Sequence, residues 1–268
     1  MSGDNFFARL ADEEACLITV HTTRGSVPRG KGAWMAVFDR GAVGTVGGGH
    51  LELQATAEAR RRLSGGQGEP VLRYPLGPAL GQCCGGEVHL QFELVSGANI
   101  DALRLRLATA RYPLALFGGG HVGHALVRVL TLLPLQVSWI DSRDEIFPVD
   151  LPSNVSCEHS DPVHSAVGSL ASGSCVLIMS FSHAEDLEVV AECLRRQRRQ
   201  MDLPYVGLIG SRSKWATFQR RLTARGFTPQ ELAHITCPIG VVGITGKQPE
   251  VIAVAVAAQI LQEIQTFS

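Results

Sequence analysis

Short apolar runs alternate with helical patterns throughout the second half of this sequence, and this alternation limits the fold more than any other feature. Apolar runs predict strands at residues 114–117, 136–140, 175–179 and 205–209. Helical spacing follows at 121–132 and 185–199, and a third helix ends near residue 225. A strand followed by a helix and another strand is typical of a parallel sheet covered by helices. The sequence therefore predicts an α/β fold with a doubly wound parallel sheet.

A glycine-rich segment follows the first of these strands and opens the first helix. Gly118, Gly120 and Gly123 have the spacing of a dinucleotide-binding loop, in which a helix N-terminus faces the phosphates. Asp141 ends the next strand, where a carboxylate meets a ribose hydroxyl, and this favours NAD. Arg143 would favour a 2′-phosphorylated form instead. These features predict a Rossmann-like domain that binds NAD(P) or another nucleotide, and a Rossmann scaffold without nucleotide is the alternative.

Polar side chains follow two further strands of the predicted sheet. His183 and Asp186 come after the strand at 175–179 and form a candidate pair for proton transfer or orientation. Helix capping by Ser182, with acidic residues in the first helical turn, is the alternative. Ser211 follows the strand at 205–209 in another strand–glycine–helix sequence, which predicts an anion site.

The first half of the chain contains short β-rich runs between glycine loops. Strands are predicted at 16–20, 34–38 and 88–94, and a helix is predicted at 50–63. A leucine- and arginine-rich helix at 101–111 is the predicted connector. The sequence therefore predicts two domains, a mixed α/β domain at 1–98 and the Rossmann-like domain at 112–268.

Two adjacent cysteines, Cys83 and Cys84, have glycines on both sides. Thiolates are soft metal ligands, and glycine lets a ligand approach the main chain closely. The alternative is a tight turn in which the cysteines are small buried apolar residues. The sequence contains no Cys-x-x-Cys pair, so zinc is not expected.

Two more glycine loops precede the cysteines and carry cations or N–H donors suited to a phosphate. The first spans 24–32 and the second spans 44–52. A surface hairpin with solvated charges is the alternative for the first loop. Arg29 and Lys31 are the candidate phosphate partners of the first loop. The second loop offers N–H donors with His50 and Glu52 near its entrance, and its candidate cofactor-binding residues are Gly48, Gly49, His50 and Glu52. Together with the cysteine loop, they predict a site for a large anionic ligand.

Composition narrows the class of protein. The net charge of −1 disfavours nucleic acid and anionic membranes as partners. No apolar run approaches the ~20 residues of a membrane helix, and residues 251–261 are better explained as a buried helix. The start of the chain does not resemble a secretory signal, and the seven cysteines form no disulfide framework. We therefore expect a cytoplasmic protein.

Taken together, these motifs resemble the XdhC/CoxI family, the xanthine dehydrogenase accessory proteins. The matching segments, in order, are GSVPRGKGAWM, GTVGGGHLE, GQCCGG, LALFGGGHVGHALV, SHAEDLE, YVGLIGSRSK and CPIGVVGITGKQPEVIA. They extend over nearly the whole chain. The resemblance implies an N-terminal XdhC-type domain followed by a Rossmann domain.

The resemblance also implies a function, that of a molybdenum cofactor (molybdopterin) chaperone. Such a protein protects the cofactor during sulfuration and helps to insert it into xanthine dehydrogenase, without turnover of its own. The implied partners are the molybdenum subunit of xanthine dehydrogenase, a cysteine desulfurase, cofactor-biosynthesis proteins and a second copy of the chain in a homodimer. Cys83 and Cys84 become candidate molybdenum contacts. The alternatives are an NAD(P)-dependent oxidoreductase and a structural adaptor that does not touch the cofactor.

Overall fold

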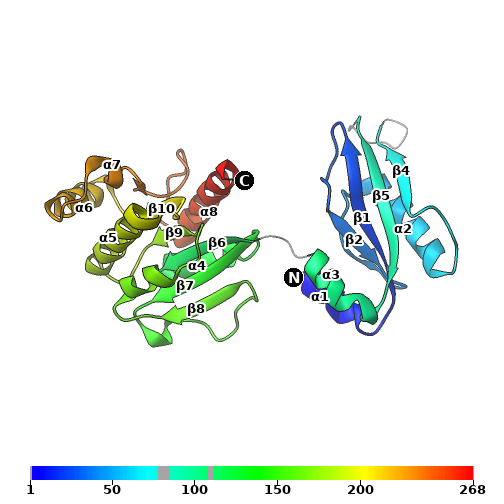
Figure 1. The fold of residues 1–268 in the computed structure, drawn as a ribbon, viewed down its shortest axis with the longest axis horizontal. Helices are drawn as coiled ribbons and strands as arrows, with labels where there is room; N and C mark the ends of the chain where they lie inside the picture. The colour runs from blue at the N-terminus through cyan, green and yellow to red at the C-terminus, as the bar shows by residue number, and fades with distance from the viewer. Residues whose placement is uncertain (1, 78–84, 108–110, 268) are drawn as a thin grey trace. The chain divides into compact units, whose positions relative to one another are not determined.

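The computed structural model describes residues 2–77, 85–107 and 111–267. The chain divides into two compact units, Met1–Ala108 and Thr109–Ser268. The first unit is coloured from blue to green in Figure 1, and the second from green to red. Each unit has hydrophobic clusters made of its own residues.

The first unit is built on a five-stranded antiparallel sheet with the strand order β3-β2-β1-β5-β4. Its strands are β1 (Ala15–Arg24), β2 (Trp34–Val37), β3 (Ala42–Gly44), β4 (Val71–Pro75) and β5 (Glu87–Val95). Alternate residues of β1 face opposite sides, as the two-residue period of a strand requires. Cys16, Ile18 and Val20 therefore join one hydrophobic cluster, while Ala15 and Leu17 join another.

Helices cover both faces of this sheet. Helix α2 (Gly49–Leu63) buries Leu51, Ala55 and Ala59, a four-residue spacing that puts them on one side of the helix. Helices α1 (Ser2–Leu10) and α3 (Ile100–Arg106) contribute apolar side chains to the cluster on the other face, which contains Ala15 and Leu17. The short 3-10 helix η2 (Gly97–Asn99) precedes α3.

The helix predicted as a connector at 101–111 belongs to the first unit. Helix α3 ends at Arg106, and Leu103 is buried in the same cluster as Leu17. The connector prediction was therefore wrong for this helix, because burial of Leu103 holds it against the sheet.

The second unit confirms the predicted parallel sheet. Six strands pair in the order β11-β10-β9-β6-β7-β8, and every pair is parallel. They are β6 (Tyr112–Phe117), β7 (Leu135–Asp141), β8 (Val155–His159), β9 (Cys175–Ile178), β10 (Tyr205–Leu208) and β11 (Ile235–Thr236). From β6 the chain adds β7 and β8 on one side of the sheet, and then returns to add β9, β10 and β11 on the other side of β6. The strand order therefore reverses between β6 and β9.

Helices lie on both faces of this sheet (Figure 1). One face packs against α4 (His121–Leu130) and α8 (Pro249–Thr266). The other face packs against α5 (His183–Gln200), α6 (Arg212–Ala224), α7 (Pro229–Leu232) and η4 (Val163–Ser169), and η3 (Asp144–Ile146) follows β7. Within the described ranges, no helix is long and apolar enough to cross a membrane.

Candidate functional site

The glycine segment 118–123 lies at the carboxyl end of β6, where the strand order reverses. In open α/β sheets this is where ligands bind. A Cβ at Gly118 would lie 2.0 Å from the carbonyl oxygen of Met179, and one at Gly123 would lie 2.2 Å from that of Gly118. These two glycines therefore permit close packing of the loop against β9 and α4. By contrast, a Cβ at Gly120 would have no heavy atom within 4 Å, so the entrance to α4 is open.

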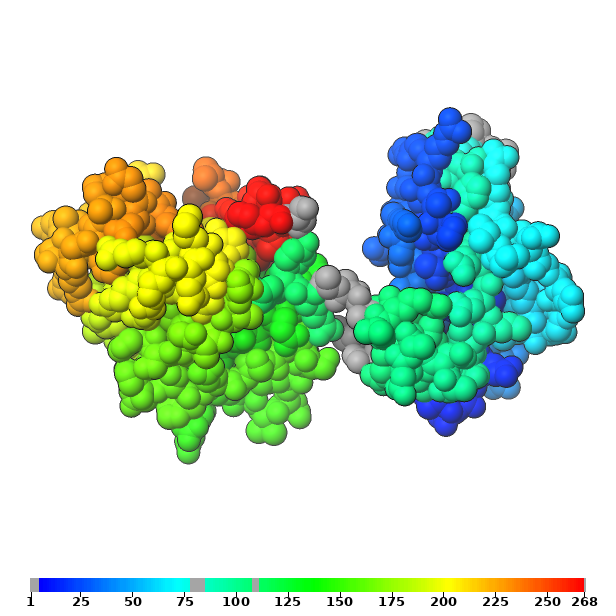
Figure 2. Space-filling view, in the orientation of Figure 1, coloured from blue at the N-terminus to red at the C-terminus, as the bar shows by residue number. Residues whose placement is uncertain are grey.

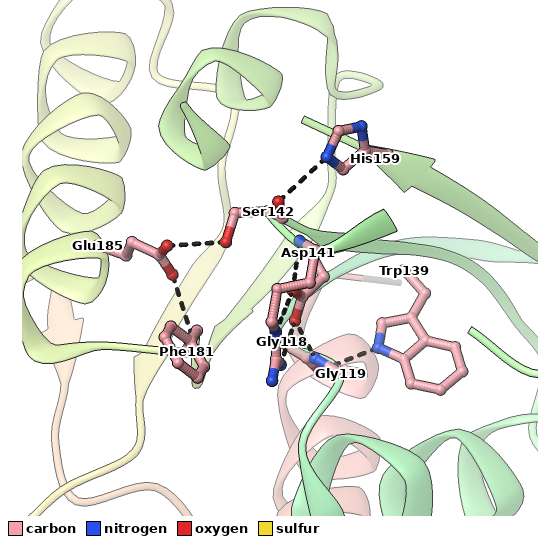
Figure 3. A network of polar contacts seen from close by, with 9 residues as sticks. Gly118, Gly119, Trp139, Asp141, Ser142, His159, Phe181 and Glu185 are labelled. Carbon is pink, nitrogen blue, oxygen red and sulfur yellow. Dashed lines mark hydrogen bonds and ion pairs between the residues drawn. The ribbon is translucent and has the colours of Figure 1, made fainter. Parts of the chain in front are cut away.

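Asp141 lies where the sequence predicts it, but its carboxylate already has partners (Figure 3). It accepts the Gly119 N–H at 2.6 Å and three donors of Arg143, each at 2.9 Å. Asp141 is only 2% exposed. Burial works to raise the pKa of Asp141, but Arg143 and the Gly119 N–H outweigh it and hold this pKa below its usual range. The carboxylate is therefore not open to a ribose hydroxyl unless Arg143 moves.

Arg143 links the glycine loop to the turn after β9. Its guanidinium carbon lies 4.5 Å from the ring centroid of Phe181. Glu185 then accepts the Phe181 N–H at 3.1 Å and the Ser142 hydroxyl at 2.7 Å, as Figure 3 shows. The result is a connected polar network across the reversal point. The sequence motifs did not indicate these contacts of Phe181 and Glu185, because the contact between the two turns depends on strand order.

The candidate pair of His183 and Asp186 does not form. Asp186 is buried and instead accepts Lys214 Nζ at 2.6 Å and the Ser180 N–H at 2.7 Å. His183 is exposed and lies edge-on to the ring of Phe218. The capping alternative is confirmed, because Ser182 Oγ accepts the Glu185 N–H at 3.2 Å. The predicted proton-transfer pair was therefore wrong.

Ser211 has a similar capping role in the next helix. Its hydroxyl accepts the Lys214 N–H at 3.1 Å at the start of α6. Lys214 also donates to the Ile209 carbonyl at 2.8 Å, so the turn after β10 is held by its own side chains.

In the first unit, the structure brings the glycine loops together. A Cβ at Gly47 would lie 2.4 Å from Pro28 Cγ, so the second loop lies directly against the first. A Cβ at Gly86 would lie 2.2 Å from the Ser26 carbonyl oxygen. The first loop therefore also contacts the residues that follow the cysteines in the chain. Cys83 and Cys84 themselves lie outside the described residues.

Three N–H groups of the second loop are not open to a ligand, because Glu52 accepts them. One carboxylate oxygen accepts the N–H groups of Val46, Gly47 and Gly48 at 3.0, 3.2 and 2.8 Å. The Thr45 hydroxyl donates to the same oxygen. Burial works to raise the pKa of Glu52, but the Thr45 hydroxyl and these N–H groups hold it below its usual value. Gly48 and Glu52 therefore form a closed anion nest, while Gly49 and His50 next to it are exposed.

The exposed cations of the first loop remain available. Arg29 and Lys31 are exposed, and neither forms an ion pair with the residues that the structure describes. A further charged cluster, which the sequence motifs did not reveal, follows Gly86. Glu87 pairs with Arg73 and with His89, and the Arg73 guanidinium is the main reason that the pKa of Glu87 falls to about 2.

The described cysteines are poor candidates for metal ligands. Burial raises the pKa of all five described cysteine thiols. For Cys16, Cys175 and Cys237 the pKa rises to about 11, so these three thiols stay protonated at neutral pH. Among the residues with described positions, no group of three His, Cys, Asp or Glu side chains could hold a metal ion. A molybdenum contact by thiolate would therefore depend on the cysteine pair at 83–84.

Two family models match this chain, one in each unit and in the order that the sequence resemblance implies. Residues 8–75 match the family model of the XdhC and CoxI family, and residues 114–260 match that of the XdhC Rossmann domain. The chain is 27% identical to the uncharacterized protein YqeB of Escherichia coli K12, over 96% of this chain and 46% of YqeB. It therefore spans about half the length of that curated relative.

A solved structure has the same fold. It is the crystal structure of a Bacillus halodurans protein named as a xanthine dehydrogenase. The match covers 100% of this chain and 97% of the Bacillus halodurans chain. The TM-score is 0.78 at 20% sequence identity, and a likeness at this identity establishes the fold alone.

Proposed function

This chain belongs to the XdhC and CoxI family, and from that membership we infer that it is a maturation accessory protein of a xanthine dehydrogenase. We propose that it binds the molybdenum cofactor, protects it during sulfuration and helps to insert it into the enzyme. The observation that carries this proposal is the presence of both XdhC units, in family order, in one chain. A cysteine desulfurase, cofactor-biosynthesis proteins and a homodimer partner belong to the same proposal.

The described residues of the first unit fit part of such a ligand. Arg29 and Lys31 have no ion-pair partner among the described residues, and their loop contacts Gly86, so a phosphate could bind near this contact. The bound cofactor would supply a molybdenum centre with sulfur ligands, for which thiolates are suitable partners. The closed nest of Glu52 is not part of the proposed ligand site, since the carboxylate binds N–H groups of its own loop.

The oxidoreductase alternative has less support from the structure. Asp141, which would bind the ribose of NAD, is held by Arg143. His183 and Asp186, the pair considered for proton transfer, are not paired with each other. The adaptor alternative leaves the glycine-flanked cysteine pair without a role.

The proposal is tested at the cysteine pair. We expect the double substitution Cys83→Ser and Cys84→Ser to reduce retention of molybdenum cofactor by about tenfold or more, because a hydroxyl is a poor ligand for a soft metal. Purified protein is loaded with cofactor and passed through a desalting column, and the retained molybdenum and pterin are then measured.

The matched control is Cys157→Ser, which changes an exposed cysteine of the second unit. This variant should retain as much cofactor as the parent protein. Circular dichroism checks that the double variant is folded. Equal retention by the folded double variant and the parent would refute the thiolate contact, and no retention by the parent would refute the chaperone proposal itself.

A further inference from the structure

A separate cavity of about 400 Å³ lies in the second unit, between α6, the start of α8 and the segment 238–246 that connects β11 to α8. It is lined by Arg212, residues 238–246, Val251, Ile252 and Ala255. In Figure 2, the connecting segment is orange and α8 is red. Because α6 follows β10 and the segment follows β11, the cavity lies beyond the carboxyl ends of these strands. Its lining includes no residue of the glycine loop at 118–123.

Two backbone N–H groups of the connecting segment donate to α8 and anchor the segment on this helix. The Gly240 N–H donates to Gln259 Oε1 at 2.6 Å, and the Val241 N–H donates to the Ala255 carbonyl at 3.2 Å. A Cβ at Gly246 would lie 2.7 Å from Val251 Cγ1, so the far end of the segment also lies close to the helix. The cavity is therefore bounded by a fixed segment, with aliphatic side chains of α8 as one wall.

Among the described residues that line the cavity, Arg212 is the single cationic side chain. It is the first residue of α6 and is exposed, and its guanidinium has no hydrogen bond or ion pair with the described residues. Acidic residues normally stabilise the first turn of a helix, but the first turn of α6 contains none. Lys214, the other cation of this turn, is neutralised by Asp186 at 2.6 Å. Arg212 therefore adds an unbalanced positive charge to the positive end of the helix.

We propose that this cavity binds a small organic anion with an apolar body. Its charged group would pair with Arg212 at the start of α6, and its body would lie against Ile239, Val251 and Ile252. The volume is within the range of pockets that take small ligands, and an apolar wall with one oriented polar group is typical of them. This inference concerns the second unit alone and does not depend on the proposed function.

Two fluorescent probes with nearly the same body test the proposal on the full chain. The anion 1-anilinonaphthalene-8-sulfonate and the neutral N-phenyl-1-naphthylamine differ in the sulfonate group. We expect Arg212→Gln to weaken binding of the anion by about tenfold, because one charge-assisted contact is lost, and to leave binding of the neutral probe unchanged. Ile244→Ala, which trims an exposed apolar residue of the lining, should weaken both probes.

Arg220→Gln is the matched control, since Arg220 is an exposed cation of the same helix outside the cavity lining. It should leave both affinities unchanged. Hydrogen exchange in the presence of the anionic probe should show added protection in residues 238–252. The proposal is overturned if the parent shows no saturable binding, if Arg212→Gln binds the anion as tightly as the parent, or if the protection lies elsewhere.

Discussion

At the scale of single residues, two carboxylates that resemble ligand-binding groups in the sequence bind their own loops instead. Glu52 accepts three N–H groups of the loop that precedes it, and Asp141 accepts the Gly119 N–H. Each carboxylate occupies N–H groups that would otherwise be free to bind an anionic ligand such as a phosphate. An anion site predicted from glycines and a helix N-terminus is therefore open only if no side chain of the chain reaches it first.

Removal of Arg143 should open the carboxylate of Asp141. The apparent affinity of a ligand that binds only the open state is reduced by the fraction of protein in that state. We therefore expect Arg143→Ala to increase the affinity for NAD⁺ by about tenfold over the parent, as measured by titration calorimetry. Arg128→Ala, which changes an exposed cation of α4 outside the network, should not alter the affinity.

Weaker binding of NAD⁺ by Arg143→Ala would show that Arg143 is itself a ligand contact. If neither the parent nor the variant takes up NAD⁺, the second unit is a scaffold at this position, and the competition between Arg143 and a ribose does not occur.

The closed nest of Glu52 should contribute to stability. Hydrogen bonds to a charged acceptor are stronger than neutral ones, so we expect Glu52→Gln to lower the free energy of unfolding by about 2 kcal/mol at neutral pH. The folded-state pKa of Glu52 lies below its ordinary value of 4.5, so this contribution is complete above pH 4.5 and is lost as the pH falls below it. Urea unfolding of parent and variant across this range measures the effect.

A matched substitution distinguishes the effect of the nest on stability from the effect of losing any carboxylate charge. Glu13→Gln removes a carboxylate from a partly exposed pair with Arg9, and we expect a change of less than about 1 kcal/mol. If the difference between Glu52→Gln and the parent does not shrink in acid, the ionised carboxylate is not the stabilising group.

At the scale of elements, two glycines at the start of α4 have different surroundings, since one is closely packed and the other borders open space. Gly123 contacts the Gly118 carbonyl, whereas Gly120 faces open space. We expect Gly123→Ala to lower the free energy of unfolding by about 1–3 kcal/mol, because the added methyl group overfills the contact between loop and helix.

Gly120→Ala is the internal comparison for this element. Its φ of −75° suits alanine, so we expect a change in stability of less than about 1 kcal/mol. Thermal unfolding of the two variants side by side is the measurement. Equal destabilisation by both would mean that the close approach at Gly123 does not hold α4 in place.

At the scale of the whole molecule, two folding units of different architecture follow one another, and each contains a match to a family model, XdhC and CoxI in the first and the XdhC Rossmann domain in the second. The first is an antiparallel sheet between helices, and its glycine loops gather beside the residues that flank the cysteine pair. The second is a parallel sheet with its own polar network at the reversal of strand order. The chain spans 46% of the length of YqeB, so that relative extends beyond the part matched by these two units.

The sequence by itself determined the parallel sheet, most of its helices and the family, because periodicity and glycine spacing are local properties of the chain. The strand at 136–140 and the helix at 185–199 were each found within a few residues of β7 and α5. Tertiary structure alone decided which polar groups are free. Arg143 reaches Asp141 and Phe181, Lys214 reaches Asp186, and α8 forms a wall of the Arg212 cavity. Most of these contacts join elements brought together by strand order and packing, which no local pattern encodes.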